Sequence, residues 1–230
     1  MSRFEPHWEV LPAAQREFWP LLAGSVDLGL VLYGGTAVAL RLGHRHSIDF
    51  DFFTEKPLDR EQLGRAFVFL RNAEVIQDRP DTLSVLAPTR EGSVKVSFFG
   101  RVDIGRAGIP ERTTDGVLEV ASLLDLLATK LKVMQQRIEA KDYLDLAAIL
   151  RTGIRLEKGL ASATAMYYPS FQPSEAVKAL TYFEGGDLAN LTEADRKLLT
   201  GAVADIRKVP AMGLASRSLS ARSEGAIGQT

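Results

Sequence analysis

The chain has 230 residues, of which 46% are hydrophobic and 25% are charged, the composition of a globular protein with a sizeable core. Its 28 basic and 29 acidic residues leave a net charge of −1, which argues against binding nucleic acid or membranes through bulk charge alone. The lack of cysteine excludes disulfides, thiolate metal sites and a thiol nucleophile, and three histidines are too few for a histidine-rich zinc site.

The sequence predicts no association with membranes. No apolar run approaches the ~20 residues that a membrane-spanning helix needs. The first ten residues lack the basic-then-apolar order of a signal peptide. We therefore expect a cytoplasmic protein whose chemistry comes from carboxylates, lysine, arginine, hydroxyl groups or a bound metal.

The first half of the chain predicts a mixture of helices and strands. Apolar residues recur at helical spacing in three stretches, residues 12–28, 36–42 and 58–70. Short runs typical of strands follow or separate them, at residues 30–33, 48–53, 74–77, 82–86 and 94–99. This order predicts an α+β (α/β-like) domain over residues 1–115.

The second half is expected to be helical. Ser122 and Asp125 form an S-x-x-D capping box that opens a helix through about Arg137. Further helices are expected at residues 141–150, 156–166, 174–184 and 193–207. The Ser-, Ala- and Gly-rich end of the chain shows no periodicity. We therefore predict a helical domain over residues 116–210 and a disordered tail over residues 211–230.

One segment departs from ordinary fold-forming sequence: Gly34-Gly35-Thr36, followed after twelve residues by Asp49-Phe50-Asp51. Asp49 and Asp51 stand two apart on a predicted strand, so their carboxylates share one face and repel each other unless a cation compensates. Aspartate is a poor strand former, and such a local conflict is expected at functional sites. Magnesium fits, because one or two carboxylates plus substrate phosphates hold it. The turn offers backbone N–H groups and a hydroxyl to a polyphosphate.

Each of these features also has a purely structural interpretation. Paired acids can lie on the solvent face of a half-buried strand, and two glycines before a helix can be only a turn. The combined order of strand, Gly-Gly-Thr turn, helix and Asp-x-Asp favours the functional interpretation.

The stretch from Tyr33 to Phe53, YGGTAVALRLGHRHSIDFDFF, resembles the signature of the AbiEii-type nucleotidyltransferases. These belong to the DNA polymerase β-like superfamily and include toxins of type IV toxin–antitoxin systems. A second segment, LLATKL at 126–131 followed by Arg137 and KDYLDL at 141–146, resembles the family's helical motif. The resemblance covers residues 30–150 and implies a polymerase β-type mixed sheet flanked by helices, followed by a helical C-terminal half.

The resemblance also implies roles for individual residues. Asp49 and Asp51 would hold Mg²⁺ or Mn²⁺, Lys130 would neutralise triphosphate charge, and Asp142 would complete the site or activate the acceptor. The expected phosphate and nucleotide contacts are Gly34, Gly35, Thr36, Arg45 and Ser47. Two structural alternatives stay open: Lys130 on a solvated helix face, and Asp142 as an acid favoured by the helix dipole.

The chain departs from the superfamily pattern at the strand expected over residues 94–99. Many polymerase β-like enzymes carry a third carboxylate on such a neighbouring strand, often as the general base. This sequence offers Lys95 and Ser97 instead. Either another acid such as Asp142 takes the role, or the base is dispensable, or activity is reduced.

The resemblance implies a magnesium-dependent nucleotidyltransferase that moves a nucleoside monophosphate from an NTP to an RNA (tRNA-like) or protein acceptor. A toxin role implies a cognate antitoxin as partner. One alternative is a degenerate member that binds nucleotide or a partner without turnover, which the missing carboxylate favours. Another is an adenylyltransferase that acts on a small aminoglycoside-like hydroxyl.

Overall fold

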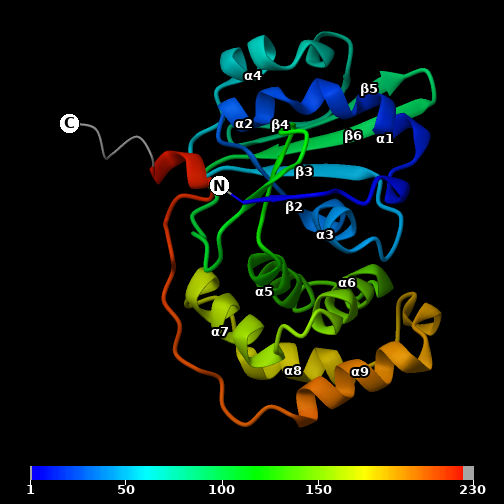
Figure 1. Ribbon diagram of the computed structural model, residues 1–230, viewed down its shortest axis with the longest axis vertical. Helices are drawn as coiled ribbons and strands as arrows, with labels where there is room; N and C mark the ends of the chain where they lie inside the picture. The colour runs from blue at the N-terminus through cyan, green and yellow to red at the C-terminus, as the bar shows by residue number, and fades with distance from the viewer. Residues whose placement is uncertain (1, 225–230) are drawn as a thin grey trace.

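A mixed β-sheet carries helices on both faces and is followed by a helical half in the computed structural model, which describes residues 2–224 (Figure 1). The strand order is β1-β7-β8-β2-β3-β6-β5-β4. The strands are β1 (Arg3–Phe4), β2 (Val31–Tyr33), β3 (Asp49–Phe53), β4 (Glu74–Arg79), β5 (Thr82–Thr89), β6 (Gly92–Phe99), β7 (Glu111–Thr113) and β8 (Glu119–Val120). The predicted α+β fold with a mixed sheet and a helical C-terminal half is confirmed.

The helices fall into two groups along the chain. Those of the sheet domain are α1 (Ala13–Phe18), α2 (Gly24–Asp27), α3 (Gly34–Leu42) and α4 (Arg60–Ala66). Those of the helical half are α5 (Leu123–Val133), α6 (Ala140–Arg151), α7 (Leu156–Tyr167), α8 (Pro173–Thr181) and α9 (Glu193–Ala204). Short 3₁₀ turns are η1 (Trp8–Val10), η2 (Trp19–Leu22), η3 (Val68–Arg71), η4 (Leu188–Asn190) and η5 (Ala221–Glu224). None of the helices within residues 2–224 is long and apolar enough to span a bilayer.

Two predicted helices are shorter than expected. The helix expected over residues 12–28 is divided into α1, η2 and α2, because Pro20 stands at the start of η2 and has no N–H for the preceding turn. The helix expected over residues 58–70 ends at Ala66, and η3 continues from it. The strands β1, β7 and β8 were not predicted, since two or three residues are too few to show a period.

The alternation of β3 separates the core from the candidate site. Phe50 and Phe52 are fully buried on one face, where Phe52 stacks on Phe98 of β6 with ring centroids 5.7 Å apart. Asp49 and Asp51 occupy the alternate positions and therefore lie on the other face. The apolar residues of β3 thus hold its two acids at fixed positions.

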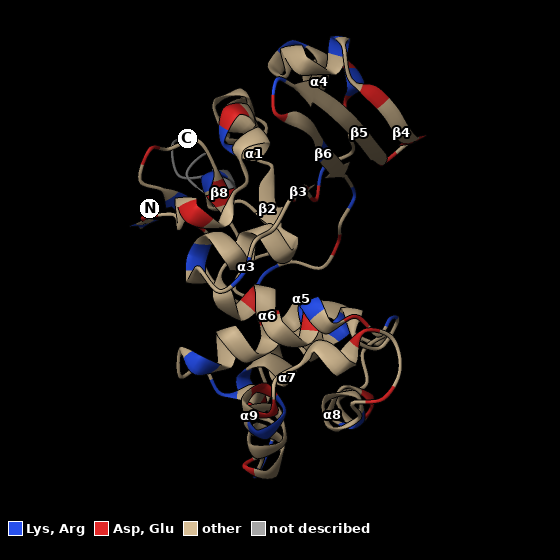
Figure 2. Ribbon diagram, turned by 90° about the vertical axis from the view of Figure 1, so that its right-hand side faces the viewer, with Lys and Arg blue, Asp and Glu red and all other residues tan. Residues whose placement is uncertain are grey.

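Helix α3 links the sheet to the helical half. It begins directly after β2, all of whose residues are buried, and packs on both α5 and α6 (Figures 1 and 2). Figure 2 also shows acidic and basic residues on α5 and α6 close to α3. The turn between β2 and α3 therefore lies beside β3 and near the charged residues of α5 and α6.

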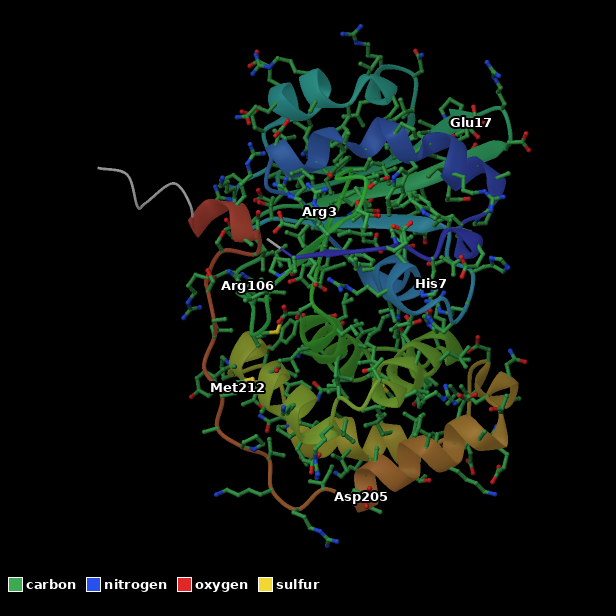
Figure 3. The ribbon with its side chains drawn as sticks, viewed as in Figure 1. Arg3, His7, Glu17, Arg106, Asp205 and Met212 are labelled. Carbon is green, nitrogen blue, oxygen red and sulfur yellow. The ribbon has the colours of Figure 1, made fainter. Side chains whose placement is uncertain are left out.

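The end of the chain corrects the prediction of a disordered tail over residues 211–230. Leu219 is fully buried, and the Ser220 hydroxyl donates to the buried Glu119 carboxylate at 2.8 Å. The backbone N–H of Arg106 donates to the Ser216 carbonyl at 2.9 Å, and Met212 lies along the segment that returns from α9 (Figure 3). A single leucine and a distant carboxylate leave no periodic signal. Residues 225–230 of the predicted tail lie outside the described residues.

We predict that Leu219→Ala lowers the free energy of unfolding by about 2–5 kcal/mol, the cost of removing a buried leucine side chain. Urea denaturation of the full chain measures it. Arg217→Ala, which removes an exposed side chain of the same segment, is the control and is expected to change stability by no more than about 0.5 kcal/mol. Equal, small effects of both substitutions would contradict the docked position of this segment.

Candidate active site

The acid pair faces a serine and a lysine on the neighbouring strand. β3 and β6 are parallel and in register, with Asp49 opposite Lys95 and Asp51 opposite Ser97. The Lys95 ammonium lies 3.9 Å from the Asp49 carboxylate, and both side chains are 42% exposed. The strand that was expected to carry a third acid is therefore the direct neighbour of the acid pair, and it carries a cation there.

Asp51 is the more enclosed of the two acids. Burial and the nearby Asp49 charge raise the pKa of Asp51, against the opposing effects of Lys95, a hydrogen bond from Ser97, and Lys130. The Ser97 hydroxyl is 2% exposed and also accepts a hydrogen bond from Ser84 of β5 at 3.1 Å. The serine pair thus fixes the orientation of Asp51, while its raised pKa follows mainly from burial and then from the Asp49 charge beside it.

The Gly34-Gly35 turn has no room for side chains. Gly34 has a φ of 77°, in the left-handed region, and a Cβ atom there would lie 2.8 Å from Asp51 Oδ2. A Cβ atom on Gly35 would lie 2.3 Å from the Arg45 guanidinium. The two glycines therefore allow the start of α3 to approach both an acid of the pair and Arg45.

Thr36 and Ser47 join the turn to the start of β3. The Thr36 side chain is 1% exposed, and its hydroxyl hydrogen-bonds the Asp49 carbonyl and, at 2.8 Å, the Ser47 hydroxyl. Both hydroxyls were expected to contact nucleotide. The geometry engages them with each other and with the backbone beside Asp49, so they hold the acid pair against the turn.

A buried ion cluster lies beneath the turn, centred on Asp145 of α6. Its carboxylate is 0% exposed and accepts from Arg45 at 2.6 and 2.9 Å, from Lys130 at 2.5 Å and from His44 Nε2 at 2.7 Å. Hydrogen bonds from His44 and Arg45 and the Lys130 charge hold the pKa of Asp145 far below its usual range, despite its burial. Arg45, an expected nucleotide contact, is thus tied to this carboxylate.

Asp142 belongs to the same cluster. One of its oxygens accepts from Lys130 at 2.7 Å, and the other accepts from Arg137 Nε at 2.9 Å. These cations lower the pKa of Asp142 although burial opposes them. Lys130 is 5% exposed, so it is not on a solvated helix face. The arrangement suits Asp142 to holding Lys130 and Arg137 in place.

The acid pair fits a divalent cation. Within residues 2–224 no group of three or more histidine, aspartate or glutamate side chains is arranged to hold a metal. Two carboxylates on one face suffice for Mg²⁺, which commonly keeps waters and completes its coordination with substrate phosphates. The space that a Cβ on Gly34 would fill lies against the Asp51 carboxylate, so Asp49 and Asp51 would be free to hold a cation there.

Filling that space gives a testable prediction. Gly34→Ala forces a left-handed alanine, at a cost of about 1–2 kcal/mol, and pushes the Asp51 carboxylate aside. We expect weaker Mn²⁺ binding, measured by calorimetry, together with a lower melting temperature. Gly201→Ala, in α9 with open space at its Cβ position, is the control and should raise stability by about 0.5–1 kcal/mol. Unchanged Mn²⁺ affinity in Gly34→Ala would contradict the placement of the site.

Sequence reasoning missed part of this geometry. Asp145 was noted only within the helical motif KDYLDL, yet its carboxylate organises the cluster. No functional role was predicted for His44, and it hydrogen-bonds Asp145 from 101 positions away. Arg137 is part of the helical motif, and it lies near enough to Asp51 for the two charges to interact. The run G-H-R-H-S before the acid pair was the available signal for this cluster.

Comparison with known proteins assigns the chain to a class of transferases. The sequence model described as nucleotidyl transferase AbiEii toxin, type IV toxin–antitoxin system, matches residues 21–205. The chain therefore belongs to the AbiEii family of nucleotidyltransferase toxins, and the resemblance drawn from its motifs is confirmed. Membership implies a nucleotide substrate and an antitoxin partner.

Individual relatives extend this finding. An uncharacterized protein of Aquifex aeolicus (strain VF5) is 34% identical over 165 residues, which are 69% of this chain and 78% of that protein. Among solved structures, the nucleotidyltransferase toxin MenT4 of Mycobacterium tuberculosis H37Rv matches with a TM-score of 0.42 and 15% identity. That match covers 85% of this chain and 92% of MenT4.

Proposed function

We propose that this protein is a magnesium-dependent nucleotidyltransferase that moves a nucleoside monophosphate from an NTP to a hydroxyl group at the end of an RNA, tRNA in particular. The observation that carries the proposal is the acid pair Asp49 and Asp51 beside the side-chain-free turn at Gly34. Membership in the AbiEii family supports the reaction class.

The transfer has a simple balance of bonds. The acceptor oxygen forms a bond to the α-phosphorus, and the bond from that phosphorus to the oxygen of the β-phosphate breaks. Pyrophosphate leaves with the electron pair, and the hydroxyl proton passes to water. When bound, Mg²⁺ supplies Lewis-acid stabilisation of the charge that develops on the phosphate oxygens.

The residues of the chain position the reactants and balance their charge. Asp49 and Asp51 would hold the cation, and the backbone N–H groups at the start of α3 would donate to the phosphates. Lys130 lies within the buried cluster, and its positive charge favours the ionised form of Asp51 without direct contact. Arg45, Asp142 and Asp145 are positioning residues in this account.

An RNA end suits the charges next to the pair. Lys95 and Arg137 are both close to half-exposed. Lys95 pairs with Asp49, and the charges of Arg137 and Asp51 interact. Exposed cations of this kind favour contact with phosphate groups, which an NTP and an RNA end both carry. The near-zero net charge of the chain agrees with contact to a short RNA end rather than to a long stretch of nucleic acid.

The acceptor can be identified directly. The full chain is incubated with Mg²⁺, total RNA and cell lysate, and with each of the four NTPs labelled at the α-phosphate in turn. We expect label in a tRNA-sized band that ribonuclease removes and protease does not. Label that protease removes would identify a protein as the acceptor instead of RNA. Label found only on an added aminoglycoside would identify a small molecule as the acceptor.

A second candidate function is a nucleotide-binding member without turnover, and the observation that favours it is Lys95 where a third acid was expected. Calorimetry with Mg²⁺ and each NTP, followed by a pyrophosphate-release assay, separates the two. Binding without release over hours, with the RNA and lysate present, would support this second candidate.

A further inference from the structure

The positions opposite the acid pair are the starting point. Because β3 and β6 are parallel and in register, Lys95 and Ser97 lie about 4.7–4.9 Å across the sheet from Asp49 and Asp51, on the same face. A ligand seated on the acid pair therefore lies close to these two positions. Of the two side chains, only Lys95 carries a charge.

The two side chains differ in what else they contact. Ser97 is buried and hydrogen-bonds both Asp51 and Ser84, so its hydroxyl is engaged within the fold. Lys95 is 42% exposed and makes one long ion pair, 3.9 Å to Asp49, among the residues that the structure describes. An exposed pair of this kind contributes little to stability, so folding alone gives little reason for a lysine here. Its ammonium group is available to a ligand.

A single metal ion fits the donors on this face. The acid pair offers two carboxylates, and the structure places a lysine, not a third acid, opposite Asp49. The Lys95 ammonium lies 3.9 Å from the Asp49 carboxylate, so a second divalent cation beside Asp49 would meet a positive charge that is already there and be repelled by it.

We propose that the Lys95 ammonium takes the place of a second metal ion: it contacts a non-bridging oxygen of the phosphate that is transferred, and the site binds one divalent cation. This inference rests on the proposed function, since the phosphate is that of the NTP. In the transfer step Lys95 moves no proton. It stabilises the negative charge that develops as the acceptor oxygen bonds phosphorus and pyrophosphate leaves.

The substitution Lys95→Gln gives opposite expectations for metal binding and for reaction rate. Lys95→Gln removes a cation that repels the metal, so Mn²⁺ should bind more tightly, by calorimetry, in the presence of non-hydrolysable α,β-methylene NTPs. The same substitution should lower kcat by about 10²-fold, because the transferred phosphate loses its contact. A lysine that serves only as a surface partner of Asp49 would leave kcat unchanged, and that result would overturn the proposal.

The number of metal ions is read from the Mn²⁺ electron paramagnetic resonance spectrum of the full chain with the same four analogues. The wild type is expected to give the uncoupled spectrum of single Mn²⁺ ions. Lys95→Asp introduces a third acid and is expected to give the spin-coupled spectrum of two neighbouring ions. Lys178→Asp, on α8, makes the same change of charge away from the site and is the control. A coupled spectrum in the wild type overturns the role of Lys95 but leaves the proposed function standing. A wild-type Mn²⁺ signal that does not differ from that of Asp51→Asn overturns both the role of Lys95 and the proposed function.

Discussion

We expect Asp51→Asn to lower the rate of nucleotidyl transfer by at least about a thousandfold while making the folded chain more stable at neutral pH. Asparagine keeps the shape of the side chain and removes the charge that a cation needs. Asp49→Ala should lose activity to a similar extent. Label transfer from an α-labelled NTP measures the rate, and thermal unfolding measures the stability.

The gain in stability follows from the sign of the pKa shift. Burial and Asp49 raise the pKa of Asp51, so the folded state binds this proton more tightly than the unfolded state does. The ionised carboxylate therefore costs stability above the folded-state pKa, and the cost disappears as the pH falls below the unfolded-state value. The melting temperature of Asp51→Asn should exceed that of the wild type at pH 7, and the difference should shrink toward zero at about pH 3.5.

The exposed acid Asp103 provides the control for this prediction. Its side chain is 86% exposed, so Asp103→Asn should leave both activity and melting temperature near the wild-type values. Full activity in the Asp51→Asn variant would contradict the site. A lower melting temperature at pH 7 would contradict the electrostatic account of Asp51.

The second large effect is expected at Asp145, whose removal should lower the free energy of unfolding by about 3–5 kcal/mol. Asp145→Ala leaves Lys130 and Arg45 buried without the carboxylate that both of them bind. Urea denaturation followed by two spectroscopic probes measures the loss. Glu175→Ala removes an exposed partner of Lys178 and should change stability by no more than about 0.5 kcal/mol.

Acidification should reduce the difference in the free energy of unfolding between Asp145→Ala and the wild type. The partners of Asp145 lower its pKa, so its contribution is fully present above the unfolded-state carboxyl pKa and is lost as the pH falls through lower values. The wild type should therefore lose more stability on acidification than the variant does. A loss below about 1 kcal/mol at neutral pH would contradict the proposed importance of the cluster.

The local sequence predicted the elements that carry the acid pair. Alternation of acids with Ile48, Phe50 and Phe52 is a short-range pattern, and β3 follows it. The strand containing Lys95 was also predicted, and its role as neighbour of the acid pair was inferred from the resemblance rather than from the pattern. The placement of Gly34 before a helix followed from turn chemistry alone.

The contacts that join distant parts of the chain were not predictable in this way. Asp145 meets His44 and Arg45 only because α6 packs on α3, and no periodicity of either helix contains that information. Leu219 and Glu119 likewise lie far apart in sequence, and their burial depends on the docking of the chain end. Paired charges of this kind become visible only when tertiary packing brings them together.

The acid pair is expected to support transfer of a nucleoside monophosphate from an NTP. Two parallel incubations with RNA and lysate test this expectation. One uses NTPs labelled at the α-phosphate, and the other uses NTPs labelled at the γ-phosphate. We expect α-label to join the acceptor with the wild type but not with Asp51→Asn, and γ-label to leave as pyrophosphate. Transfer of γ-label to the acceptor, or transfer of α-label that survives Asp51→Asn, would contradict nucleotidyl transfer by this site.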